Sequence, residues 1–217
     1  MKFDFHIHSC YSCDSLSRPQ GIVEFAKKNG LSGIAITDHN IIKGGLEAAG
    51  FCDDKFMVII ASEISTEIGD IVALFLKKDI ISRNSLDVIE EIHAQGGLAV
   101  LAHPFKRVKA ISDDIVNNLD AIEAFNSRNP YNSEALNLAQ KHNMPILAGS
   151  DAHFLFEIGR AFVDLSISDS NLNIASVKEA VQYARPCAGR PRIVCRKSPL
   201  FLDAMSQMVR YYKMSFK

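Results

Sequence analysis

The chain lacks the patterns that mark secreted proteins, membrane proteins and proteins that bind long nucleic acids. Its 217 residues begin without the charged, apolar and small-residue order of a signal peptide. They contain no run of about 18 apolar residues, the length that crosses a bilayer. The formal net charge of −1 gives no basic excess for a nucleic-acid backbone, although a nucleotide or a short strand stays open as a substrate. We therefore expect a cytoplasmic protein that does not bind membranes.

Cysteine is scarce and shows no framework of paired residues. The five cysteines are an odd number and are scattered along the chain. Without a secretion signal, free thiols are the simplest interpretation. Cys10 and Cys13 form a single C-x-x-C pair, which without a second pair is only a weak indication of a zinc or redox site.

The amino-acid composition is typical of one compact domain, with 47% hydrophobic and 23% charged residues. Short apolar runs, each read as a strand, cover residues 2–7, 33–36, 57–61, 70–76, 98–101, 121–125, 145–148 and 161–165. Helical spacing covers residues 19–29, 42–49, 84–95, 113–119, 133–142, 176–184 and about 199–215. This alternation predicts an α/β fold with a parallel sheet, most simply a closed or nearly closed barrel of about seven units. An open doubly wound sheet is the alternative, but no glycine-rich nucleotide loop follows the first predicted strand.

Residues able to bind metal follow most of these strands. His6 and His8 lie one residue apart at the first strand end, so both side chains point to the same face. Imidazole is the commonest metal ligand in proteins, and active sites of barrels lie at the carboxyl ends of the strands. Buried in a core without a metal, such residues would lack polar partners. The chain therefore predicts a metal centre from residues that follow the strands, namely His6, His8, Asp38, His39, Glu63, His103, Asp151 and His153.

These motifs, taken in order, resemble the PHP (polymerase and histidinol phosphatase) family. The resemblance rests on H-I-H-S at 6–9, S-x-D-S at 12–15, T-D-H-N at 37–40, S-E at 62–63, H-P at 103–104 and G-S-D-A-H at 149–153. It covers residues 4 to about 165 and implies one PHP-like domain over residues 1–217. The implied fold is a distorted (β/α)7 TIM-like barrel with two or three divalent metal ions.

The resemblance also implies which residues hold each metal. The first ion would be bound by His6, His8, Glu63 and Asp151, the second by Glu63 and His103, and the third by Asp14, His39 and His153. Some family members place further histidines where this chain has Asp70 and, on the sixth predicted strand, Glu123 and Asn126. The second ion is therefore expected to have the fewest ligands.

Mixed imidazole and carboxylate ligands suit zinc, manganese or iron without selecting one. Clustered divalent ions lower the pKa of a bridging water and stabilise the in-line transition state of phosphoryl transfer. The predicted function is therefore a metal-dependent phosphoesterase that hydrolyses a phosphomonoester or a phosphodiester. We expect Glu63 and Asp151 to act in catalysis as ligands. Asp38 is expected to orient His39 or to carry a proton, with orientation preferred.

A phosphate substrate also needs cationic side chains near the metals. The candidates are Arg18, Lys106, Arg107, Arg128 and Arg160, each of which follows a predicted ligand segment. A solvated surface charge is the alternative for every one of them. The lack of a basic stripe favours a small phosphorylated substrate over a long nucleic acid.

Two other functions stay open on the sequence alone. An amidohydrolase-like enzyme that cleaves C–N or ester bonds also begins with an H-x-H pair. A non-catalytic PHP-fold subunit of a larger assembly is the second, although it predicts eroded ligands. The amphipathic C-terminal segment, about 199–215, would either pack on the barrel or form an interface, for example in a homo-oligomer.

Overall fold

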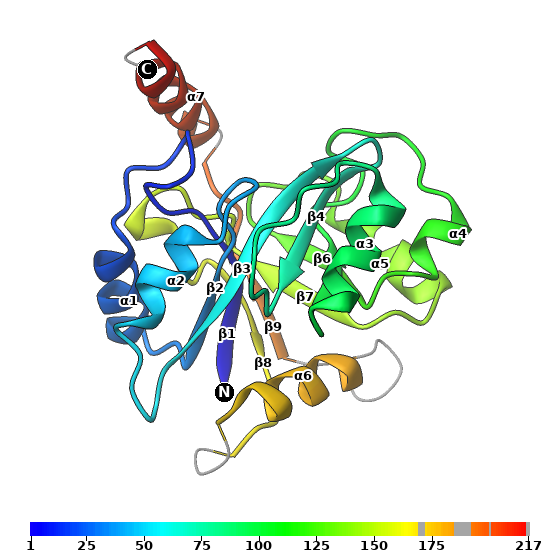
Figure 1. Ribbon diagram of the computed structural model, residues 1–217, viewed down its shortest axis with the longest axis horizontal. Coiled ribbons are helices and arrows are strands. Elements are labelled where there is room, and N and C mark those ends of the chain that lie inside the picture. Colours follow the sequence, from blue (N-terminus) through cyan, green and yellow to red (C-terminus); the bar gives the residue numbers. More distant parts are fainter. Residues whose placement is uncertain (169–171, 185–191, 200, 216–217) are drawn as a thin grey trace.

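The computed structural model describes residues 1–168, 172–184, 192–199 and 201–215 (Figure 1). Cys187 lies outside the described residues. The first half of the chain contains β1 (Lys2–Ile7), α1 (Pro19–Lys28), β2 (Gly33–Ile36), α2 (Lys43–Ala49), β3 (Met57–Thr66), β4 (Gly69–Leu74), α3 (Ser85–Ala94) and β5 (Leu98–Leu101). The second half contains α4 (Asp113–Val116), β6 (Ala121–Asn126), α5 (Asn132–Lys141), β7 (Ile146–Gly149), the 3-10 helix η1 (Leu155–Glu157), β8 (Ala161–Asp164), α6 (Ile174–Tyr183), β9 (Arg192–Cys195) and α7 (Phe201–Ser215).

The described strands form one sheet that curls into a nearly closed barrel. Their order is β7-β6-β5-β4-β3-β2-β1-β8-β9, and β7 at one edge packs against β1, β8 and β9 across the barrel. The expected α/β barrel is confirmed. The sheet is mixed, however, where a parallel sheet was expected: β4 runs antiparallel to β3 and β5, and β8 runs antiparallel to β1 and β9. A hairpin of only two residues joins β3 to β4, and such a short connection permits only antiparallel pairing.

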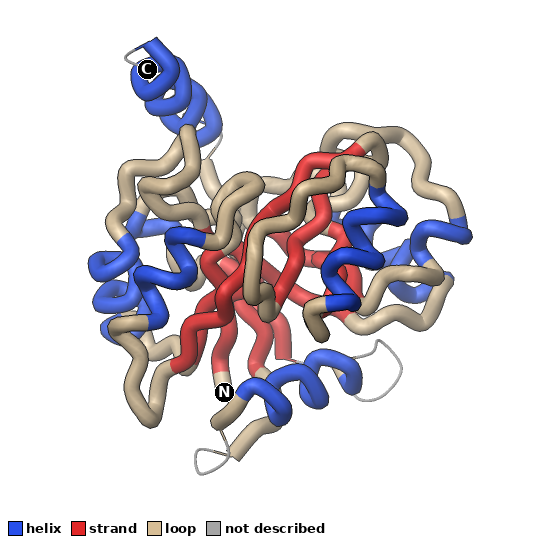
Figure 2. Tube along the Cα trace, viewed as in Figure 1, coloured by secondary structure: helices blue, strands red, loops and turns tan. Residues whose placement is uncertain are grey.

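Three buried apolar clusters hold the barrel together. The first fills the barrel interior around Phe3, Phe5 and Leu147. The second packs α3, α4 and α5 on the outer face of β4 to β7, and the third packs α1 and α2 on the outer face of β1 to β3 (Figure 2). Val177 and Val181 of α6 belong to the interior cluster and close the end of the barrel at which β1 begins. The carboxyl ends of the parallel strands stay open at the opposite end.

The C-terminal helix α7 lies at this open end of the barrel, beside the loop that follows β1 (Figure 1). Of its described residues only Leu202 and Ser206 are buried. Its large apolar side chains are largely exposed, with 71% exposure for Met208 and 77% for Tyr211. The helix therefore does not pack its apolar side on the barrel. None of the helices in the described part of the chain has both the length and the apolar character of a membrane span.

We expect the substitution Phe3→Ala to lower the free energy of unfolding by about 3–5 kcal/mol, because Phe3 is fully buried and the loss leaves a cavity inside the barrel. Urea denaturation followed by circular dichroism measures this change. Phe201→Ala is the matched control, since Phe201 is 62% exposed and its loss should change stability by no more than about 0.5 kcal/mol. Equal stability of the two variants would contradict the described core.

Candidate metal centre

The predicted ligands converge at the open end of the barrel from five strands and one loop. His6 lies in β1 and Glu63 in β3, while the other ligands follow β1, β2, β5 and β7. A backbone bridge between Ile7 and Ala152 joins β1 to the segment after β7, and one between His39 and Glu63 joins the segment after β2 to β3. All eight side chains are buried except that of His39, which is 23% exposed. Closure of the barrel thus gathers residues that are up to 147 positions apart in the sequence, namely His6, His8, Asp14, His39, Glu63, His103, Asp151 and His153.

Glu63 lies at the centre of this group and faces imidazoles on both of its oxygens. Its Oε1 is 2.7 Å from His103 Nε2 and 3.6 Å from His6 Nε2. Its Oε2 is 2.9 Å from His39 Nδ1 and 3.5 Å from His8 Nε2. The two oxygens therefore face different ligands, which is the arrangement that a bridging carboxylate needs.

The donor atoms form three overlapping groups, in each of which all atoms lie within 4.8 Å of one another. The groups are His8-Asp14-His39-His153, His6-Glu63-His103 and His6-His8-Asp151. Two buried carboxylate oxygens at the site, Asp14 Oδ1 and Asp70 Oδ2, have no hydrogen-bond partner. Buried carboxylate oxygens of this kind need a partner, and a cation supplies one. The described residues thus fit a multinuclear metal site.

Three of the histidines are oriented by hydrogen bonds that leave Nε2 for a metal. His6 Nδ1 lies 3.1 Å from Glu123 Oε1, and His153 Nδ1 lies 2.8 Å from the carbonyl oxygen of Asp151. His8 Nδ1 lies 3.1 Å from Ser12 Oγ, whose own hydroxyl donates to Asp38 at 2.6 Å. Each Nδ1–H therefore has an acceptor, so the lone pair of each ring is on Nε2.

Asp38 is hydrogen-bonded to the loop that follows β1. Its carboxylate accepts hydrogen bonds from the backbone N–H groups of Ser9 and Ser12 and from both hydroxyls. Asp38 is fully buried and is not among the residues that line the cavity above the ligands. Its carboxylate therefore orients His8 through Ser12. From the sequence, His39 was the histidine that Asp38 was expected to orient.

The surroundings of the ligands lower the pKa of Glu63 and of His8 but raise that of His39. Burial opposes ionisation of Glu63, but the neighbouring histidines outweigh it and hold its pKa well below the ordinary value. Burial and the nearby imidazoles of His153 and His39 lower the pKa of His8 to about 3. Burial also lowers the pKa of His39, but hydrogen bonds to Asp14 and Glu63 raise it to about 11. Without a metal, protons on histidine balance the buried acids, and metal binding would release them.

Two ligands have a backbone conformation that side chains rarely adopt. His103 has φ +28° and Asp151 has φ +54°. Both follow short buried strands and are held there by the surrounding barrel, which is common for residues at functional sites. Position 149, two residues before Asp151, also has to be glycine, because a Cβ there would overlap His6 and Glu123.

Comparison with known proteins supports the same interpretation. Residues 4–111 match the model described as PHP domain, and residues 129–185 match the model described as PHP-associated. The chain is 42% identical over 142 residues to the uncharacterized protein MJ1587 of Methanocaldococcus jannaschii. This match covers 58% of this chain and 82% of that protein. The chain belongs to the PHP domain family.

Solved structures show the same PHP fold. A two-domain protein from Bacteroides vulgatus, described as containing a predicted PHP-like metal-dependent phosphoesterase, superposes with a TM-score of 0.71 at 20% identity. The match covers 96% of this chain and 69% of the other. A protein from Bifidobacterium adolescentis, described as a putative metal-dependent phosphoesterase, superposes with a TM-score of 0.61 at 17% identity. This match covers 92% of this chain and 97% of the other.

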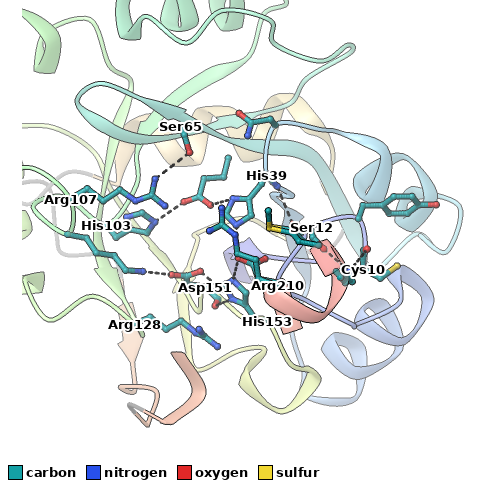
Figure 3. A pocket seen from close by; sticks show the side chains of 18 residues that line it. Cys10, Ser12, His39, Ser65, His103, Arg107, Arg128, Asp151, His153 and Arg210 are labelled. Carbon is teal, nitrogen blue, oxygen red and sulfur yellow. Dashed lines mark hydrogen bonds and ion pairs between the residues drawn. The ribbon is translucent and has the colours of Figure 1, made fainter. Parts of the chain in front are cut away.

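A cavity of about 870 Å³ opens above the PHP ligands and has several cationic side chains in its wall (Figure 3). Of the five predicted substrate-binding cations, Lys106, Arg107 and Arg128 line it. Lys106 Nζ lies 3.2 Å from Asp151 Oδ2, while the buried guanidinium of Arg128 is held by Glu157 at 2.7 Å. The structure adds two cations to the wall, namely Arg210 and Lys213.

The other two predicted cations are not brought to this cavity, which corrects the expectation for them. Arg18 is the exposed, extended N-cap residue of α1 and borders a shallow surface groove together with Phe154 and Phe156. Arg160 donates to the carbonyl oxygen of Lys197, on the segment that follows β9. Cys10 and Cys13 do line the cavity and have free thiols, but neither belongs to the described groups of metal-binding donors.

Glu123 contacts the ring of the predicted ligand His6, whereas the sequence offered Glu123 only at the place of a further histidine ligand of the family. We expect Glu123→Ala to weaken metal binding by about 10- to 100-fold, because His6 loses the acceptor that fixes its ring. Titration with manganese, followed by elemental analysis of the bound metal, measures this loss. Glu134→Ala on the exposed side of α5 is the matched control and should bind metal like the natural chain. Unchanged affinity in Glu123→Ala would contradict this role of Glu123.

Proposed function

We propose that this PHP protein is a metal-dependent phosphoesterase that hydrolyses a small phosphorylated substrate. The observation that carries the proposal is the intact set of buried donors around Glu63, which opens into a cavity with a cationic wall. Its volume of about 870 Å³ is in the range typical of sites for small molecules. A long nucleic acid would need a basic surface, and the net charge of −1 does not provide an excess for one.

The three donor groups correspond to the three metal positions expected from the family. His6, His8 and Asp151 would hold the first ion, and Asp14, His39 and His153 the third. Glu63 would bridge the first ion to the second, since its Oε2 faces His8 and its Oε1 faces His103. Divalent ions bound there would activate a water molecule and neutralise charge on the phosphoryl oxygens.

We assign Asp70 as a further ligand of the second ion, beside His103. Its carboxylate is buried, and Oδ1 is already held by Arg107 and Ser65 at 2.9 Å each. Oδ2 has no hydrogen-bond partner and lies 3.9 Å from His103 Nε2. Asp70 occupies a position where other family members carry a histidine, so a carboxylate would replace the imidazole there.

The residues around the metals then have separate tasks. Lys106 lies beside Asp151 and can meet an anionic group that enters the cavity. Burial lowers the pKa of Lys106, but the carboxylates of Asp151 and Glu63 outweigh burial and raise it, so the ammonium stays charged. Asp38 and Glu123 keep the histidines in the geometry that binds metal.

The cationic wall favours a phosphoester over the amide or ester substrates of the amidohydrolase-like alternative, because neutral substrates make no use of several cations. The intact donors disfavour a non-catalytic subunit. Elemental analysis of the purified protein, followed by a panel of phosphoesters and amides with and without manganese, tests the proposal. A metal-free protein, or one that cleaves amides and no phosphoester, would overturn it.

We expect Glu63→Ala to lower kcat/KM for 4-nitrophenyl phosphate by at least about a hundredfold, because the bridging ligand is lost. Release of 4-nitrophenol in manganese-containing buffer measures the loss. Glu67→Ala on the hairpin between β3 and β4 is the matched control, since its carboxylate bonds Ser85 and does not line the cavity. Substantial metal-dependent turnover by Glu63→Ala would contradict the assignment.

We expect Asp70→Ala to bind fewer manganese ions per chain than the natural protein under the same conditions, with the fold unchanged. Elemental analysis after dialysis measures the number of ions. The exposed Asp87→Ala provides the control and should bind the same number as the natural protein. An unchanged number of ions in Asp70→Ala would show that Asp70 only anchors Arg107.

A further inference from the structure

One face of α7 carries polar side chains that meet the rest of the molecule at the mouth of the cavity. Asp203, Ser206, Arg210 and Lys213 are spaced by three, four and three residues, so they share one side of the helix. The apolar side chains Met208 and Tyr211 lie away from this side and are exposed. The helix thus faces the metal centre with its polar side.

Two sets of hydrogen bonds hold α7 in place on either side of Arg210. Toward the start of the helix, Arg128 donates to Asp203 Oδ1 at 2.9 Å and to Ser206 Oγ at 3.1 Å. Toward its end, Lys213 Nζ donates to the carbonyl oxygens of Cys10, Ser12 and Ser15 at 2.8, 2.7 and 2.6 Å. These three carbonyls belong to the loop that carries the ligand Asp14. The stretch of α7 between the two anchors is therefore fixed relative to the metal centre.

Arg210 lies in that fixed stretch and lines the cavity together with Glu63, Asp151 and His153 (Figure 3). The other cations of the wall are already engaged: Lys106 by Asp151, Arg107 by Asp70, Arg128 by Glu157, and Lys213 by the loop carbonyls. Arg210 has no hydrogen-bond or ion-pair partner among the described residues. Its guanidinium thus keeps all of its donors for a ligand in the cavity.

We propose that Arg210 is a substrate-binding residue of this site, and that it receives the phosphoryl oxygens of a substrate held at the metal centre. This inference rests on the function proposed above. A guanidinium matches the oxygens of a phosphoryl group with two parallel hydrogen bonds, which a lysine cannot do. Because α7 comes from the far end of the chain, the C-terminal helix becomes part of the substrate site. The anchors formed by Arg128 and Lys213 give Arg210 its position.

The test compares Arg210→Ala with Gln207→Ala, an exposed position on the same helix that does not line the cavity. Calorimetric titration of the manganese-loaded protein with inorganic phosphate gives Kd without any need for turnover. We expect Kd to rise by about 10- to 100-fold in Arg210→Ala, the size of a lost charge-assisted hydrogen bond, and to stay unchanged in Gln207→Ala. The manganese content should be the same in all three proteins, since Arg210 is no ligand.

Kinetics with 4-nitrophenyl phosphate give a second measurement that a purely structural role would not reproduce. Arg210→Ala should raise KM more than it lowers kcat. Arg210→Lys keeps the charge but loses the paired donors, so its KM should lie between those of Arg210→Ala and the natural chain. Equal phosphate affinity in Arg210→Ala and the natural chain would overturn the inference. A natural chain that binds phosphate through Arg210 but hydrolyses no phosphoester would instead overturn the proposed function and leave the anion-binding role of Arg210 standing.

Discussion

The buried carboxylate of Glu63 is the interaction on which the site depends. It faces four imidazoles at 2.7 to 3.6 Å, and those imidazoles come from β1 and the loops after β1, β2 and β5. A buried charge is costly unless an opposite charge lies beside it. Protons on His6 and His39 balance Glu63 in the protein alone, because the nearby carboxylates raise the pKa values of both rings against the effect of burial. Divalent ions would balance the negative charge of Glu63 in place of these protons.

A ring of residues outside the ligands gives the site its geometry. Asp38 binds the loop after β1, and Ser12 passes this constraint on to His8. Glu123 holds His6 from β6, and Gly149 leaves the space in which they meet. These contacts set the tautomer of each ring, and the tautomer decides which nitrogen is available for a metal. The shape of the centre is therefore built from residues that would never touch the metal.

Most of the fold was predictable because each element has a local signal. Buried strands appear as short apolar runs, and residues able to bind metal follow them, so the barrel and seven of the eight predicted ligands could be read together. The eighth, Asp14, was predicted from the family resemblance. The antiparallel course of β4 was missed, because an apolar run reads the same in either direction. β9 was missed as well, since its apolar run, Ile193 to Cys195, is only three residues long and lies between arginines.

The sequence by itself determined the chemistry of this protein: the donors, their order and the strand ends that present them are all local patterns. Only the tertiary structure decided which cations face the metals. Arg18 and Arg160 follow ligand segments yet are not in the cavity wall, whereas Arg210 and Lys213, about 60 residues beyond the last ligand, are part of it. The physical reason is that the position of a side chain around a barrel mouth depends on long-range packing. Here that packing is the contact of α7 with Arg128 and with the loop after β1.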